Sequence, residues 1–145
     1  MSDEFDELEK YIMDDARKVF SETVIDYCMN PRNVGEIDNA DGCARVTGPC
    51  GDTMAIWLKV NKDMIADIYF MTDGCGTSIA SGSMVTDLAK GKNIDEARKI
   101  KQEDVLTALG GLPEESRHCA LLAANTLKEA IADYNAKQKR PEKKS

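Results

Sequence analysis

The sequence has little of several residue types: one histidine, one tryptophan and four prolines among 145 residues. It has no apolar run near the roughly 18 residues that a membrane-spanning helix needs, which argues against a membrane protein. Basic residues are outnumbered 26 to 19 by acidic ones, so the net charge is −7. This balance argues against binding to nucleic acids or anionic membranes, because both need a basic surface. The acidic start, MSDEFDELEK, has no apolar core of a secretory signal, so we expect a cytoplasmic protein.

Five cysteines are present, an odd number for a disulfide framework. In a reducing cytoplasm, clustered cysteines with a histidine indicate metal binding or thiol chemistry instead. Cys28 lies in a helical stretch and Cys43 at the start of a strand. Because cysteine is among the residues most often buried, we interpret these two as buried structural residues.

The hydrophobic pattern predicts helices at both ends of the chain and strands between them. A helical stretch covers 4–28 and contains a break before Ser21, a candidate N-cap. Short connections between the strands favour an antiparallel meander, so we predict one α+β domain. The expected strands are 43–48, 53–60 and 64–71, and the expected later helices are 77–90, 93–100, 102–109 and 114–135.

Three further cysteines lie where the pattern predicts loops or helix starts. Glycines flank Cys50 in TGPCGDT and Cys75 in TDGCGTS, and Cys119 lies near the start of the last helix. A helix N-terminus carries free N–H groups and partial positive charge, which favour a thiolate. We therefore predict three thiols of lowered pKa that converge at one end of the sheet.

The single histidine, His118, directly precedes Cys119. Three sulfurs and one imidazole nitrogen form a complete tetrahedral set for zinc, and they could equally hold an iron–sulfur cluster. The wide spacing of these residues favours a site that can open over a closed zinc finger. Asp52 follows Cys50 by two residues and adds a hard oxygen ligand and negative charge, which would weaken a bound cluster.

Four segments together resemble the IscU/NifU N-terminal iron–sulfur assembly scaffold family. They are FSETVIDYCMNPRNVGEID, GPCGDTMAIWLKV, TDGCGTSIASGSMVTDLAKGK and RHCALLAANTLKEAIADY, in this order. The resemblance implies an α+β fold whose small three-stranded antiparallel sheet has helices packed on one face. On this basis we expect an extra helical extension over 1–19, a scaffold domain over 20–136 and a polar tail over 137–145.

The resemblance also implies roles for individual residues. It makes Cys50, Cys75, His118 and Cys119 the cluster ligands, Asp52 the residue that keeps the cluster labile, and Cys119 the persulfide acceptor. It implies a transient 2Fe-2S cluster built from iron and from sulfur supplied by a cysteine desulfurase, with zinc in the cluster-free form. Apo iron–sulfur proteins would receive the cluster, and the protein would be a scaffold and not a turnover enzyme.

The chain departs from the family pattern at residues 112–116. They read LPEES, where the family often has Leu-Pro-Pro-Val-Lys for an Hsp70-type chaperone, so this partnership is not implied. A zinc-dependent sulfur-transfer protein of the SufU type is the alternative, although that group lacks the histidine and carries an insertion. A structural zinc domain is the third interpretation. The sequence leaves a homodimer and a homotrimer open.

Overall fold

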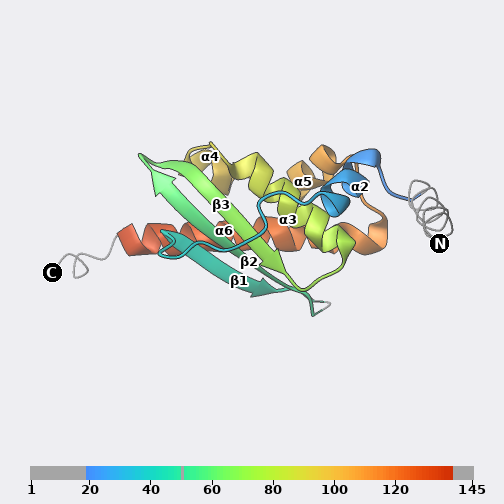
Figure 1. Ribbon diagram of the computed structural model, residues 1–145, viewed down its shortest axis with the longest axis horizontal. Helices are drawn as coiled ribbons and strands as arrows, with labels where there is room; N and C mark the ends of the chain where they lie inside the picture. Colours follow the sequence, from blue (N-terminus) through green and yellow to red (C-terminus); the bar gives the residue numbers. More distant parts are fainter. Residues whose placement is uncertain (1–18, 50, 139–145) are drawn as a thin grey trace, which may run out of the picture.

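The computed structural model describes residues 19–49 and 51–138. The extension expected over 1–19 therefore lies outside the described residues, apart from residue 19. Figure 1 shows the sheet on one side and the helices gathered against one of its faces. The elements are α2 (Glu22–Met29), β1 (Gly42–Thr47), β2 (Thr53–Asn61), β3 (Met64–Thr72), α3 (Gly76–Ala89), α4 (Ile94–Arg98), α5 (Gln102–Leu109), the 3-10 helix η1 (Glu114–Ser116) and α6 (Arg117–Gln138).

The three strands form an antiparallel sheet in the order β1-β2-β3. Lys62 and Asp63 connect β2 to β3 with φ angles of 54° and 65°. Two successive residues with positive φ form the tight hairpin turn whose twist matches that of the flanking strands. The predicted antiparallel meander is confirmed.

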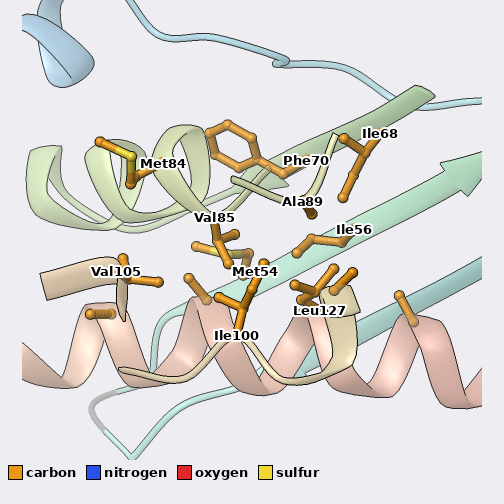
Figure 2. Close-up of a cluster of buried hydrophobic side chains, with 14 of the residues drawn as sticks. Met54, Ile56, Ile68, Phe70, Met84, Val85, Ala89, Ile100, Val105 and Leu127 are labelled. Carbon is orange, nitrogen blue, oxygen red and sulfur yellow. The ribbon is translucent and has the colours of Figure 1, made fainter. Parts of the chain in front are cut away.

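Strand β2 alternates between the helix-covered face and the open face of the sheet. Met54, Ile56 and Leu58 are completely buried and point toward the helices. In Figure 2, Met54 and Ile56 lie between Val85 of α3 and Leu127 of α6. Burial of each such side chain stabilises the fold by roughly 1.5–3 kcal/mol, so β2 is the central element of the core.

Helix α3 lies close to the sheet because its inner surface is built from small residues. Gly82 faces the ring of Phe70 on β3, and a Cβ at this position would overlap the ring. Helix α2 packs on the other side of α3, and α5 and α6 also contact it. This tight packing fixes the first residue of α3 at the end of β3.

Helix α6 crosses β1 and β2 along its length. Near its C-terminal end, Gly42 of β1 lies against the backbone of Ala130 and the Cβ of Tyr134, and no larger residue would fit there. This contact anchors the second half of α6 at the start of β1. The first turn of α6 therefore lies toward the opposite end of that strand, where β1 leads into β2.

The boundaries of the helices agree with the sequence at several caps. Ser21 is the N-cap of α2 and accepts a 3.0 Å hydrogen bond from the backbone N–H of Val24, so the predicted break is confirmed. Gly91, with φ +84°, directly follows Lys90, the C-cap of α3. The last helix differs from its expected range of 114–135: its first turn is the 3-10 helix η1, and α6 continues to Gln138. Among the described residues, no helix combines the length and apolarity needed to cross a bilayer.

Candidate functional site

Three chain segments that are far apart in the sequence meet near the end of the sheet where β1 leads into β2 (Figure 1). Asp52 comes from the β1–β2 connection, Cys75 is the N-cap of α3, and His118 and Cys119 lie in the first turn of α6. Each segment is held by a packed element behind it, so the side chains are positioned by the core and not by the loops alone.

The most compact group of metal-binding side chains in the described residues contains Asp52, His118 and Cys119. One ligand atom from each of the three lies within 4.8 Å of the other two. The Cys119 sulfur is 3.7 Å from Nε2 of His118. A carboxylate oxygen, an imidazole nitrogen and a thiol sulfur are thus close enough to reach one metal ion after small side-chain movements.

Cys75 stands beside this group, connected to it through a hydroxyl. The Oγ1 of Thr77 lies 3.1 Å from the Cys75 sulfur and 3.3 Å from the Cys119 sulfur. Thr77 is buried, so its hydroxyl has little access to water and is held between the two thiols. Of the residues expected to converge, Cys75, His118 and Cys119 thus lie at one end of the sheet together with Asp52. Cys50 lies outside the described residues, so the full ligand set stays a prediction.

The two described thiols of this site differ in acidity. The hydroxyl of Thr77 is the main cause that lowers the pKa of Cys75. Burial opposes it, and the backbone N–H groups of Ser78 and Thr77 at the start of α3 lower the pKa further. Burial raises the pKa of Cys119 and outweighs the hydroxyls of Ser78 and Thr77. The prediction of a lowered pKa is confirmed for Cys75 and is wrong for Cys119, because only 1% of Cys119 is exposed.

Ser78 connects the carboxylate to the buried thiol. Its hydroxyl donates to Oδ2 of Asp52 at 3.2 Å and lies 3.4 Å from the Cys119 sulfur. Ser78 therefore lies between the buried thiol and the carboxylate, within hydrogen-bond distance of both.

The two glycines that flank Cys75 are each needed because a larger side chain would collide with a different neighbour. A Cβ at position 74 would overlap the Ser78 hydroxyl and approach Oδ2 of Asp52 to 3.0 Å. A Cβ at position 76 would approach the Cys28 sulfur to 2.8 Å. The Gly-Cys-Gly pattern therefore makes room for the Asp52–Ser78 hydrogen bond on one side and for another cysteine on the other.

The remaining two cysteines were both interpreted as buried, and this is wrong for Cys43, which is exposed on β1. Burial alternates along β1, and Cys43 is one of the exposed residues of this alternation, so packing does not cover it. Cys28 is half-buried. Burial raises the pKa of Cys28, and the negative charge of nearby Cys75 raises it further.

Sequence reasoning missed Thr77 and Ser78, although both stand directly after the Gly-Cys-Gly motif. Their signal was the position in the first turn of a helix whose N-cap is a candidate ligand, where short hydroxyl side chains reach back toward the cap.

An open groove of about 870 Å³ between β1 and α6 lies away from this site. Its lining includes Lys128 and Glu129 but none of the candidate ligands, so its size does not make it the reactive centre.

Comparison with known proteins agrees with this fold. The chain belongs to the family described as the NifU-like N terminal domain, whose family model matches residues 19–141. A NifU-like protein (N-terminal) from Brucella abortus has the same fold, with a TM-score of 0.64 at 20% identity, covering 81% of this chain and 94% of that one.

Individual relatives are more similar in sequence. The chain is 51% identical over 117 residues to iron-sulfur cluster assembly scaffold protein IscU 1 of Archaeoglobus fulgidus, covering 80% of this chain and 76% of that protein. It is 48% identical over 124 residues to the scaffold protein IscU of Escherichia coli (strain K12), covering 82% and 96%. It is 44% identical over 129 residues to the scaffold protein IscU of Aquifex aeolicus, covering 87% and 82%.

Proposed function

We propose that this protein is a scaffold on which a transient 2Fe-2S cluster is assembled from iron and persulfide sulfur and then passed to apo-proteins. The observation that carries the proposal is the meeting of Asp52, His118 and Cys119 within 4.8 Å, with Cys75 one hydroxyl away. The scaffold relatives, at 44–51% identity, support the same function.

The cluster is the cargo of this site, and the donor set fits it. Thiolates are the usual ligands of iron–sulfur clusters, and an imidazole can replace one of them. Cys75, His118 and Cys119 supply two sulfurs and a nitrogen from two helix starts. Cys50 supplies the third thiolate in this proposal, which its position two residues before Asp52 in the sequence supports.

Asp52 keeps the cluster exchangeable. Its carboxylate oxygen lies within 4.8 Å of the ligand atoms of His118 and Cys119, and the hydroxyl of Ser78 donates to it. A hard oxygen holds iron in a cluster less tightly than sulfur does, and its charge adds to that of the thiolates. A scaffold has to release what it builds, so an imperfect ligand set serves this function.

Cys119 is the persulfide acceptor in this proposal, and a cysteine desulfurase is the donor. Because Cys119 is 1% exposed, the acceptance of sulfur requires the three segments around it to separate. Ligands carried on separate segments permit such an opening, whereas ligands within one tight loop would resist it. The reaction takes place in the cytoplasm, where thiols stay reduced, and apo iron–sulfur proteins receive the product.

In the cluster-free form, the same residues hold zinc. The alternative function, zinc-dependent sulfur transfer of the SufU type, uses a metal to organise one acceptor cysteine. The position of His118 next to Asp52 and Cys119 favours the cluster scaffold, since that alternative group lacks the histidine.

Anaerobic reconstitution with ferrous iron, L-cysteine and a cysteine desulfurase tests the function. We expect the visible absorption of a 2Fe-2S cluster and two irons and two sulfides per site. Cys75→Ser should abolish it, whereas Cys43→Ser should not, because Cys43 is exposed on β1 away from the site. A protein that binds one zinc tightly and forms no cluster under these conditions would contradict the proposal and favour sulfur transfer.

A further inference from the structure

Helix α2 contributes nothing to the cluster ligands, yet its last turn carries a thiol toward them. Cys28 lies one residue before the end of α2 (Glu22–Met29), which packs along α3. Its side chain is half-buried and forms no disulfide. The sulfur of Cys28 therefore lies in the contact between the two helices, and not in the centre of the core.

The contact at Gly76 locates this sulfur next to the site. A Cβ on residue 76 would stand 2.8 Å from the Cys28 sulfur, closer than non-bonded atoms approach. Gly76 directly follows Cys75, the N-cap of α3. Glycine at this position thus leaves the space that the Cys28 sulfur occupies, one residue along the chain from Cys75, and the two thiols are close enough for the charge of Cys75 to act on Cys28.

Cys75 is the described thiol of the site that is open to solvent, whereas Cys119 is buried. The two share the hydroxyl of Thr77, so sulfane sulfur on Cys119 can pass to Cys75 by thiol exchange without leaving the site. In that exchange the Cys75 thiolate attacks the outer sulfur of the Cys119 persulfide, and Cys119 leaves as a thiolate.

We propose that Cys28 is a resolving thiol, which releases sulfide from a persulfide on Cys75. The Cys28 sulfur attacks the inner sulfur of the Cys75 persulfide, a Cys28–Cys75 disulfide forms, and the outer sulfur leaves as hydrosulfide. The outer sulfur gains two electrons, the two cysteine sulfurs lose them, and the Cys28 proton goes to the departing sulfide. A dithiol reductant then returns the disulfide to two thiols.

This inference rests on the proposed function and specifies one step of it. Persulfide sulfur is too oxidised for a cluster, which contains sulfide, so a scaffold supplied with persulfide needs a source of two electrons. A second thiol within the fold provides them at the place where the sulfide is used. The proximity of the two helices makes the exchange intramolecular and hence fast relative to attack by a thiol from solution.

The test uses the full chain, reduced and then freed of reductant, under anaerobic and iron-free conditions. The probe is glutathione persulfide, and the readouts are released sulfide and the mass of the peptides that contain each cysteine. We expect the wild-type protein to release sulfide and to gain a Cys28–Cys75 disulfide. Cys28→Ser should keep the extra sulfur on Cys75 and release sulfide at least about tenfold more slowly. Cys43→Ser is the matched control, and it should behave as the wild type does.

Equal sulfide release from Cys28→Ser and the wild type would overturn the proposal, and so would a disulfide between Cys75 and a cysteine other than Cys28. Absence of persulfide on Cys75 in Cys28→Ser would also overturn it, because the step starts there. Circular dichroism of both variants excludes misfolding as the cause. A separate reconstitution with ferrous iron and inorganic sulfide distinguishes a failure of the proposed function from a failure of this inference. A wild-type chain that forms no cluster there fails the proposed function, whereas one that forms it but shows no Cys28-dependent release fails this inference alone.

Discussion

Helices α3 and α6 each present a cysteine at or inside their first turn, and the two thiols differ in exposure and acidity. Cys75 is the N-cap of α3, where backbone N–H groups and the Thr77 hydroxyl point at its sulfur. Cys119 is already the third residue of α6 and turns into the core. The comparison teaches that a position near a helix start does not by itself favour a thiolate: the Thr77 hydroxyl lowers the pKa of Cys75, whereas burial raises the pKa of Cys119.

The difference in exposure leads to the largest expected effect. With iodoacetamide at about pH 8, Cys75 should be alkylated at least about a hundredfold faster than Cys119, since Cys119 reacts only after local opening. Peptide mass spectrometry at a series of times gives both rates from one sample. If the alkylation rates of the two cysteines agreed within a factor of about three, Cys119 would be as accessible as Cys75 in solution, which would contradict the difference in exposure.

Removal of the shared hydroxyl should weaken the contrast in acidity. Thr77→Val keeps the shape of the buried side chain but removes the hydrogen bond that is the main cause of the lowered pKa of Cys75. The alkylation rate of Cys75 at about pH 7 should fall by roughly tenfold, because hydrogen bonds to charged groups contribute about 1.5–3 kcal/mol. A pH profile of the rate separates this effect from misfolding, since only a pKa change moves the midpoint. An unmoved midpoint would mean that the helix start alone sets the acidity.

The carboxylate between the two helices should affect the lifetime of the cluster. Asp52→Ala removes a hard ligand and a negative charge, so the reconstituted cluster should persist in air roughly two- to fivefold longer and transfer more slowly to an apo-ferredoxin. Asp52→Asn is a useful companion, because it keeps an oxygen for Ser78 and removes only the charge. Decay of the visible absorption gives all three lifetimes. Faster decay in Asp52→Ala would indicate that the Asp52–Ser78 hydrogen bond mainly holds the loop.

The smallest expected effect is on stability at alkaline pH. Because the pKa of Cys119 is raised in the folded state from an ordinary value of 9.0, its contribution to stability is complete below that value and is lost as the pH rises through the folded pKa. Cys75 acts with the opposite sign, since its lowered pKa gives stability that is lost as the pH falls through its folded pKa. Urea unfolding above about pH 9 should therefore show a shallower decline for Cys119→Ala than for the wild type. If the free energy of unfolding declined equally with pH in both proteins, the buried thiol of Cys119 would not be the cause of the alkaline loss of stability.

Much of the fold could be predicted from the sequence because it depends on local patterns. The alternation in 53–60 and the two turn residues after it define the hairpin, and Ser21 defines the start of α2. The candidate ligands could also be identified, since Cys75 and the pair at 118–119 stand in recognisable motifs.

What could not be predicted depends on contacts between distant segments. The burial of Cys119 follows from the packing of α6 on the sheet, which no local pattern reports. The position of the Cys28 sulfur beside Gly76 follows from the packing of α2 on α3. Likewise, Cys43 is exposed because it belongs to the alternate residues of β1 that the helices do not cover, and which face is covered depends on how α6 packs.

The single histidine of the chain permits the most direct test of the central claim, which is that the cluster bridges the starts of α3 and α6. The protein is prepared with 15N-labelled histidine, reconstituted anaerobically, reduced by one electron and studied by pulsed EPR. If His118 binds the cluster, the spectrum contains one strongly coupled nitrogen that changes from the 14N to the 15N pattern on labelling. A cluster spectrum that is identical for labelled and unlabelled protein would contradict the account.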